Sequence, residues 1–103
     1  MLVAFSPLAQ TDLEGIGDYI AQDSPANAVR FVERLRAQCR KLVRAPMGYV
    51  ARPELGAGLR SCALGRYVIF FRPGVDVVRI ERILHSARDV EAEFEPDDDS
   101  QDR

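Results

Sequence analysis

Arg79, Glu81 and His85 are the side chains whose types and spacing best suit acid–base chemistry in this chain. They stand two and four residues apart in a largely apolar segment, so an extended backbone would place all three on one face. A carboxylate or an imidazole can accept and return a proton, and a guanidinium can stabilise negative charge in a transition state. Because any open sheet face carries polar residues at this spacing, a catalytic set and a simple polar surface both remain open.

Other kinds of reactive site find little support in the sequence. It contains no glycine-rich phosphate loop, no metal-ligand spacing and no paired nucleophile and base. Asp97, Asp98 and Asp99 could bind a metal, but a solvated acidic tail explains them more simply. Cys39 and Cys62 are interpreted as reduced, partly buried thiols. We therefore expect no metal and no cofactor.

The sequence also lacks the features of a membrane or secreted protein. No apolar run approaches the roughly 18 residues that a membrane span requires. The first residues show no basic region followed by an apolar stretch, so no secretory signal is recognised. We expect a cytoplasmic protein that makes no membrane contact.

The formal net charge of −2 conceals a basic body and an acidic end. Residues 91–103 hold seven acidic side chains and one Arg, which leaves 13 basic and 9 acidic side chains in residues 1–90. Of the 14 basic residues, 13 are Arg, which either a GC-rich bacterial genome or contact with carboxylates and phosphates would explain. We expect residues 1–95 to form one domain and residues 96–103 to be a disordered acidic tail.

Two helix-start signals organise the first half of the chain. Ser6 and Ser24 can cap free backbone N–H groups, and each precedes a proline, which the first helical turn tolerates. Apolar residues recur at helical spacing after both, so we expect helices from residue 7 to the break at residues 23–25, and over residues 25–44. The first helix is acidic and the second basic, and the short break predicts an antiparallel hairpin.

Short strands account for most of the remaining sequence. A strand over residues 2–5 precedes the helices, and a loop over residues 45–58 follows them. Strands are then predicted over residues 59–64, 67–71 and 77–84, with a short helix near residues 87–94. The order β-α-α-β-β-β predicts an α+β domain in which the helical hairpin packs on a small, mostly antiparallel sheet. The sequence does not fix where the first strand joins that sheet.

Alternation along residues 77–84 predicts which side chains face the helices. Val78, Ile80 and Leu84 fall on one side and are expected to pack against the hairpin. Ile83 and His85 fall on the other side, together with Arg79 and Glu81, and are expected to look onto the open face of the sheet.

The element order and several short motifs resemble the ParE branch of the ParE/RelE toxin superfamily over roughly residues 3–90. Any one motif is weak, and the arrangement as a whole is fairly specific. The motifs are Phe5-Ser6-Pro7, Tyr19-Ile20, Pro25-Ala26, the Phe31 and Leu35 pair, Gly65-Arg66-Tyr67-Val68-Ile69-Phe70-Phe71, and Val78-Arg79-Ile80-Glu81-Arg82-Ile83-Leu84-His85-Ser86-Ala87-Arg88-Asp89.

The resemblance implies the toxin of a type II toxin–antitoxin pair. Toxins of the ParE type are understood to inhibit DNA gyrase, and a small antitoxin with a DNA-binding N-terminus and a flexible arm neutralises them. For such a toxin we expect no direct nucleic-acid contact by the toxin alone. The alternative is a ribosome-dependent mRNA endoribonuclease of the RelE type, for which Arg79, Glu81 and His85 would be the catalytic set. Against it stand the modestly basic body and the ParE-like ending, so we expect a protein that acts by binding and not as an enzyme.

Site residues follow from this interpretation. The candidates for target binding are Arg79, Arg82, His85 and Arg88, and those for antitoxin binding are Tyr19, Phe31 and Tyr49. Competing structural roles are a hydrogen-bonded strand end for His85, burial in the core for Tyr19 and Phe31, and a solvated surface for the arginines.

Overall fold

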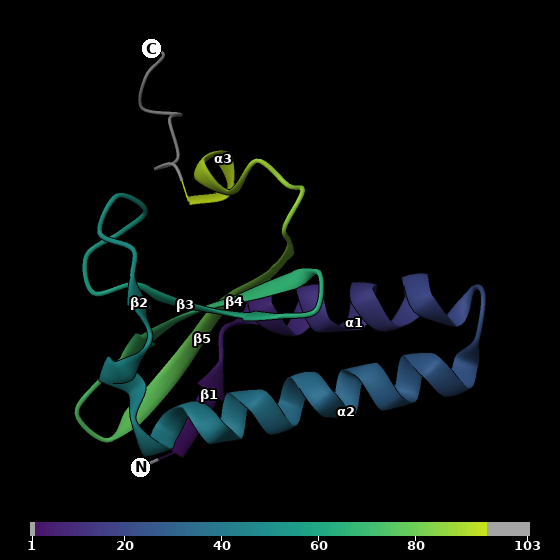
Figure 1. Cartoon of the computed structure of the whole chain (residues 1–103), viewed down its shortest axis with the longest axis horizontal. Coiled ribbons are helices and arrows are strands. Elements are labelled where there is room, and N and C mark those ends of the chain that lie inside the picture. The colour runs from purple at the N-terminus through teal and green to yellow at the C-terminus, as the bar shows by residue number, and fades with distance from the viewer. Residues whose placement is uncertain (1, 95–103) are drawn as a thin grey trace.

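Two antiparallel helices lie across one face of a mixed five-stranded sheet (Figure 1). The structure is a computed structural model that describes residues 2–94. Its elements are β1 (Leu2–Phe5), α1 (Pro7–Ala21), α2 (Pro25–Lys41), the 3-10 turns η1 (Leu42–Arg44) and η2 (Pro46–Gly48), β2 (Val50–Ala51), β3 (Arg60–Leu64), β4 (Tyr67–Pro73), β5 (Val77–His85) and α3 (Val90–Phe94). The predicted α+β class and helical hairpin are confirmed. The expected tail at residues 96–103, with its Asp97–Asp99 run, lies outside the described residues.

Both helices begin as their sequences predict. The Ser6 Oγ accepts a hydrogen bond from the Ala9 N–H at 3.0 Å, and the Ser24 Oγ accepts one from the Asn27 N–H at 3.2 Å. The Ser6 hydroxyl also donates to the Glu81 carbonyl oxygen at 2.7 Å. This buried serine therefore caps α1 and ties its start to β5.

The strand order is β1-β5-β4-β3-β2. β1 pairs with β5 in parallel, and the other neighbours are antiparallel. The parallel pairing answers the question that the sequence left open, because the helical hairpin carries the chain from β1 back to the sheet. β2 lies in the segment expected to be a loop, where only Val50 and Ala51 pair with β3.

A bulge in β5 changes which side chains face the helices. Phe70 pairs with Arg82 and Phe71 with Ile80, which leaves Glu81 as an extra residue in β5. Side chains beyond the bulge therefore exchange faces. The prediction for Val78 and Ile80 is confirmed, whereas Leu84 packs on the far face and Ile83 packs with the helices.

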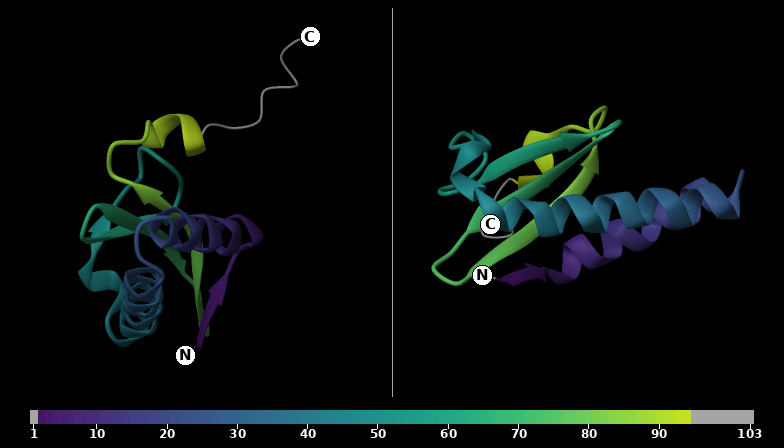
Figure 2. Two further views of the ribbon diagram at one scale, coloured as in Figure 1. Left: turned by 90° about the vertical axis from the view of Figure 1, so that its right-hand side faces the viewer. Right: turned by 60° about the horizontal axis from the view of Figure 1, so that its bottom comes forward.

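Two apolar clusters pack on opposite faces of the sheet. Figure 2 shows the elements that cover these faces, with α1 and α2 on one side and α3 on the other. The helix-facing cluster includes Leu13, Ile16, Leu35 and Cys39 with Ile69, Phe71, Val78, Ile80 and Ile83 of the sheet. The second cluster is Leu55, Leu59, Phe70 and Leu84, covered by Val90 and Phe94. The face opposite the hairpin, expected to be open, is therefore partly covered by α3 and the 52–59 loop.

Gly17 lies where the two helices approach each other closely. A Cβ atom at this position would lie 3.3 Å from Cγ2 of Val32, whereas one at Gly15 would meet nothing within 4 Å. Gly17 is thus at the contact and Gly15 is not. No helix within residues 2–94 is both long and apolar enough to cross a membrane.

Candidate functional site

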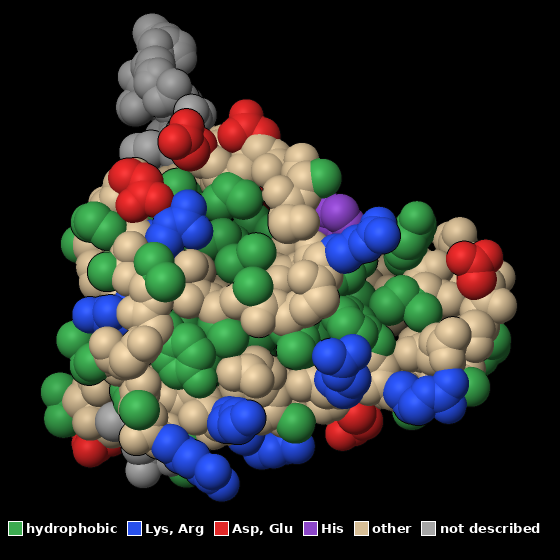
Figure 3. Space-filling model, in the orientation of Figure 1, with side chains coloured by type: hydrophobic (Ala, Val, Ile, Leu, Met, Phe, Trp, Pro, Cys, Tyr) green, Lys and Arg blue, Asp and Glu red, His purple; other side chains and the backbone are tan. Residues whose placement is uncertain are grey.

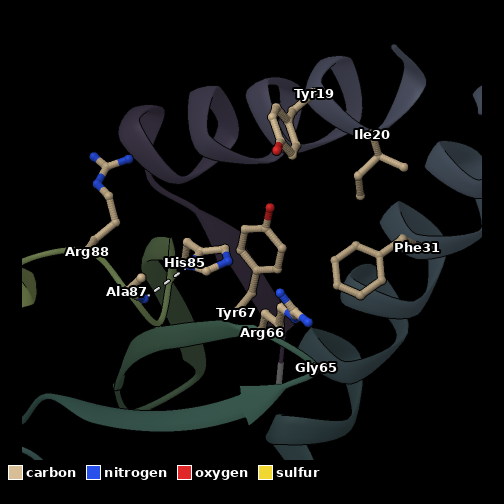
Figure 4. Close-up of a pocket in the computed structure, with 9 residues that line it drawn as sticks. All are labelled: Tyr19, Ile20, Phe31, Gly65, Arg66, Tyr67, His85, Ala87 and Arg88. Atoms are coloured by element: carbon tan, nitrogen blue, oxygen red, sulfur yellow. Dashed lines mark hydrogen bonds between the residues drawn. The ribbon is translucent and has the colours of Figure 1, made fainter. Parts of the chain in front are cut away.

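A groove of about 700 Å³ opens between the helical hairpin and one end of the sheet (Figure 4). It forms where α1 ends, α2 begins, β3 turns into β4 and β5 ends. Its lining residues, called the aromatic groove below, are Tyr19, Ile20, Phe31, Gly65, Arg66, Tyr67, His85, Ala87 and Arg88.

Aromatic rings in contact form the wall of the groove. The Tyr67 ring lies 5.5 Å from the Phe31 ring and 5.2 Å from the His85 ring, which it meets edge-on. Tyr19 stands across from them on α1, 67% exposed, and its side chain points toward Tyr67 in Figure 4. Exposed aromatic side chains around a concave apolar surface are typical of sites that receive a partner's side chain.

The β3–β4 turn gives the groove its open end. Gly65 has a φ of +60°, and Arg66 completes a two-residue turn between β3 and β4. Glycine adopts this left-handed conformation without the steric cost that a Cβ atom brings. A Cβ at Gly65 would lie 3.6 Å from the Phe31 ring, which is an ordinary contact, so the positive φ is what favours glycine there.

His85 has one nitrogen committed to the backbone. Its Nδ1 accepts a hydrogen bond from the Ala87 N–H at 3.0 Å. The neutral imidazole therefore carries its proton on Nε2. The strand-end hydrogen bond expected for His85 is confirmed, and its Nε2 makes no hydrogen bond within residues 2–94.

Arginines flank the aromatic groove. The Arg34 guanidinium lies 5.6 Å from the centre of the Phe31 ring. Arg88 pairs with Glu93 of α3 at 2.7 Å. Arg66 is exposed and forms no ion pair with any carboxylate within residues 2–94. The groove thus joins an apolar floor to a cationic rim.

The proposed catalytic set does not converge. Arg79 and Arg72 both pair with Glu81, at 3.3 and 3.1 Å, on the sheet face that α3 partly covers. His85 pairs across from Tyr67 and packs on the helix side of the sheet. The expectation that Arg79, Glu81 and His85 share a face is therefore wrong, because the bulge moves His85 to the opposite side.

The four candidates for target binding are also divided. His85 and Arg88 line the aromatic groove, while Arg79 lies on the other face of the sheet, at a hollow that Glu93 and Phe94 of α3 also line. Arg82 is only 12% exposed and pairs with Asp12 and Glu93, so it holds α1, β5 and α3 together. These contacts raise the pKa of Arg82, first through its hydrogen bond to Asp12.

Two of the three candidates for antitoxin binding meet in the groove. Tyr19 and Phe31 face it. The alternative expectation, burial in the core, is wrong for Tyr19, which is exposed, and holds in part for Phe31, which is partly buried. Tyr49 lies elsewhere, edge-on to Phe71 at 5.8 Å. The pattern missed Tyr67, because its position inside an apolar strand gave no sign that its ring lies at the groove.

Neither cysteine is suited to act as a nucleophile. Burial raises the pKa of the Cys39 thiol to about 12, with a smaller contribution from nearby Cys62. Burial also raises the pKa of Cys62, and the Gln38 amide donates to its sulfur at 3.4 Å. Both therefore stay protonated near neutral pH. Within residues 2–94 no three His, Cys, Asp or Glu side chains gather as a metal site would require.

Comparison with known proteins gives one consistent family. A family model described as the ParE toxin of the type II toxin–antitoxin system, parDE, matches residues 3–90. Toxin ParE1 of Caulobacter vibrioides is 33% identical over 85 residues, which cover 82% of this chain and 88% of that protein.

Solved structures agree with this match. A chain of the chromosomal ParDE toxin–antitoxin system from P. aeruginosa superposes with a TM-score of 0.71 at 25% identity, covering 82% of this chain and 95% of that one. A chain of the toxin–antitoxin complex RelBE2 from Mycobacterium tuberculosis gives a TM-score of 0.53 at 27% identity, with the same two coverages.

Proposed function

Because the chain belongs to the ParE toxin family of type II toxin–antitoxin systems, we propose that it inhibits DNA gyrase and that a cognate antitoxin neutralises it. The chain is a toxin of the ParE/RelE superfamily, and both parts of the proposal rest on that membership. The observation that supports gyrase binding over RNA cleavage is the division of Arg79 and Glu81 from His85 by the sheet. Acid–base cleavage needs its groups around one reacting phosphate, whereas inhibition by binding needs only a complementary surface.

The aromatic groove is the proposed antitoxin site. The similar structures come from ParDE and RelBE systems, both of which pair a toxin with an antitoxin. An arm carrying an apolar or aromatic side chain would bury it between Tyr19 and Phe31, and acidic neighbours would meet Arg66 and Arg88. The antitoxin is proposed to be a small protein with a DNA-binding N-terminus, and the pair to act in the cytoplasm.

A supercoiling assay tests the gyrase target. Purified full-length protein is added to gyrase, ATP and relaxed plasmid, and supercoiled product is measured by gel. We expect loss of supercoiling that depends on toxin concentration and is reversed by the antitoxin. Unchanged supercoiling at a large molar excess of folded toxin would refute the gyrase assignment.

The RelE-type alternative has its own assay. The structural similarity to a chain of the RelBE2 complex is the observation that favours testing the ribonuclease alternative. Ribosomes programmed with a defined mRNA are incubated with the toxin, and cleavage is mapped by primer extension. We expect an intact message, and cuts at the ribosomal A site that vanish with His85→Ala would identify the protein as a ribonuclease.

A further inference from the structure

The outer face of α2 and the η1 turn that follows it carry a row of cations that the proposed function does not use. Arg30, Arg34, Lys41 and Arg44, called the basic stripe below, are separated by four, seven and three residues and are all exposed. Side chains at these spacings fall on one side of a helix. Figure 3 shows Lys and Arg side chains gathered along the lower edge of the molecule, over α2.

The basic stripe borders a hollow in the surface. Arg34, Arg40, Lys41 and Arg44 line a depression of about 470 Å³ beside β3, together with Gln38 and Leu64. Four cationic side chains therefore converge on one concave polar site. Its lining has few apolar side chains, in contrast to the aromatic groove.

No carboxylate in the described chain neutralises these cations. Arg52, Arg72, Arg79, Arg82 and Arg88 each pair with Asp or Glu within residues 2–94. None of the arginines of the basic stripe, nor Lys41, forms such a pair, and Glu33 is the one acidic residue in the sequence of α2. Like charges three and four residues apart repel each other along a helix. Repulsion among cations that no carboxylate within residues 2–94 neutralises is expected of a surface that binds an external negative charge.

We propose that the basic stripe binds the sugar-phosphate backbone of a nucleic acid. From residue 30 to residue 44 the stripe spans about 21 Å, at about 1.5 Å per helical residue. One strand of B-form DNA presents about six phosphates over that length, at about 3.4 Å each along the axis. The row therefore matches a regular line of phosphates in both charge and extent, and guanidinium groups bind phosphate oxygens bidentately.

An acidic protein segment fits the stripe less well. Specific protein partners usually anchor an aromatic or aliphatic side chain in a pocket, whereas Leu64 and Ala37 are the only apolar residues among the seven that line this hollow. Backbone phosphates need only a line of cations, without side-chain anchors. The proposal departs from the sequence-based expectation that the toxin alone contacts no nucleic acid, and it does not depend on which enzyme the toxin inhibits.

Salt-dependent binding of the full-length protein tests the proposal. Fluorescence anisotropy is measured with a labelled duplex DNA and a duplex RNA of about 20 base pairs, of arbitrary sequence, between about 50 and 200 mM salt. The double variant Lys41→Gln, Arg44→Gln removes two cations of the stripe. The matched control Arg52→Gln, Arg79→Gln removes two cations on another part of the surface. Circular dichroism confirms that all three proteins are folded.

For the unaltered protein we expect a slope of log affinity against log salt of about −2.7 to −3.6, as three or four phosphate contacts would give. The stripe variant should flatten that slope by about 2, and the control should leave it nearly unchanged. Equal affinity for DNA and RNA would show that the stripe binds sugar-phosphate backbones in general. A preference for one would show which nucleic acid it binds. Absence of binding at low salt, equal loss in the control, or binding to polyglutamate that duplex DNA does not displace would overturn the proposal.

Discussion

The guanidinium of Arg82 donates two hydrogen bonds, of 2.8 and 2.9 Å, to the carboxylate of Asp12. The same carboxylate accepts a third hydrogen bond from the Ile83 backbone N–H at 2.9 Å. Both side chains are only 12% exposed. This pair joins α1 to β5 directly after the bulge at Glu81. It therefore stabilises the backbone in which the Ile83 side chain faces the helices and the Leu84 side chain faces α3.

Replacement of Asp12 should cost far more than loss of an exposed ion pair. Asp12→Ala leaves Arg82 and the Ile83 N–H without their acceptor, and we expect a loss of about 2–4 kcal/mol of unfolding free energy. Arg79→Ala, which removes an exposed partner of Glu81, should cost about 0–1 kcal/mol. Urea denaturation of both variants measures the difference. Similar losses in the two would show that the Asp12 contacts contribute little.

The sequence-based face assignments in β5 are correct before the bulge and wrong after it. Serine–proline starts, helical spacing and tight turns are local signals, and they predicted α1, α2 and the β3–β4–β5 succession. The extra residue at Glu81 arises from pairing with β4 and from the Asp12 contact with Ile83, which no pattern within residues 77–85 reveals. Every face assignment beyond it was therefore inverted.

The candidate site was partly predictable for the same reason. Tyr19, Phe31, His85 and Arg88 were recognised as separate candidates, but the groove that unites them needs the ends of α1, α2 and β5 to meet. Tyr67 joins them through tertiary packing alone. Arg82 was assigned to a target because its charge is visible in the sequence, whereas its partner Asp12 stands 70 positions away.

The two glycines of α1 should respond oppositely to the same change. Gly15→Ala adds a helix-favouring side chain in open space and should stabilise the protein by about 0.5–1 kcal/mol. Gly17→Ala places its Cβ against Val32 Cγ2, so packing strain should cancel that gain or exceed it. Thermal and urea unfolding of the two variants give the comparison. An equal gain at both positions would contradict the close approach of α1 and α2.

Docking of α3 should weaken in acid. Hydrogen bonds from Arg88 and then Arg82 hold the pKa of Glu93 below its usual 4.5. A lowered folded-state pKa contributes stability above pH 4.5 that is lost as the pH falls through the folded value. Arg82 donates to Asp12 as well as to Glu93, so the ion pairs of Glu93 connect α3 to α1 through Arg82. The protection factors of the α3 amides, which correct the measured exchange for its intrinsic dependence on pH, should therefore fall below about pH 4.5.

A matched pair of variants isolates Glu93 in that experiment. Glu93→Gln should show low protection factors in α3 already at neutral pH and little further loss of protection in acid. Glu91→Gln alters an exposed residue of the same helix that makes no ion pair with residues 2–94, and it should retain the acid-induced change. If both variants behave like the unaltered protein, the ion pairs of Glu93 do not hold α3.

The two thiols should differ in reactivity toward a disulfide reagent. Cys39 is fully buried with a pKa of about 12, while Cys62 is partly exposed. At about pH 8 we expect slow modification of Cys62 alone in the folded protein and of both thiols after denaturation. Cys62→Ser should abolish the reaction of the folded form. Rapid titration of two thiols without denaturant would show that the core around Cys39 opens readily.

Tyr19 should contribute strongly to antitoxin affinity and little to stability. Its side chain is 67% exposed at the aromatic groove, so Tyr19→Ala removes contact area from a partner without opening a cavity in the core. We expect binding of the cognate antitoxin to weaken by at least about tenfold, as for other aromatic anchors at interface centres. Val29→Ala is the matched control, because Val29 is 66% exposed on α2 and lies outside the groove. Isothermal titration calorimetry measures both affinities, and an equal effect of the two changes would place the antitoxin elsewhere on the toxin.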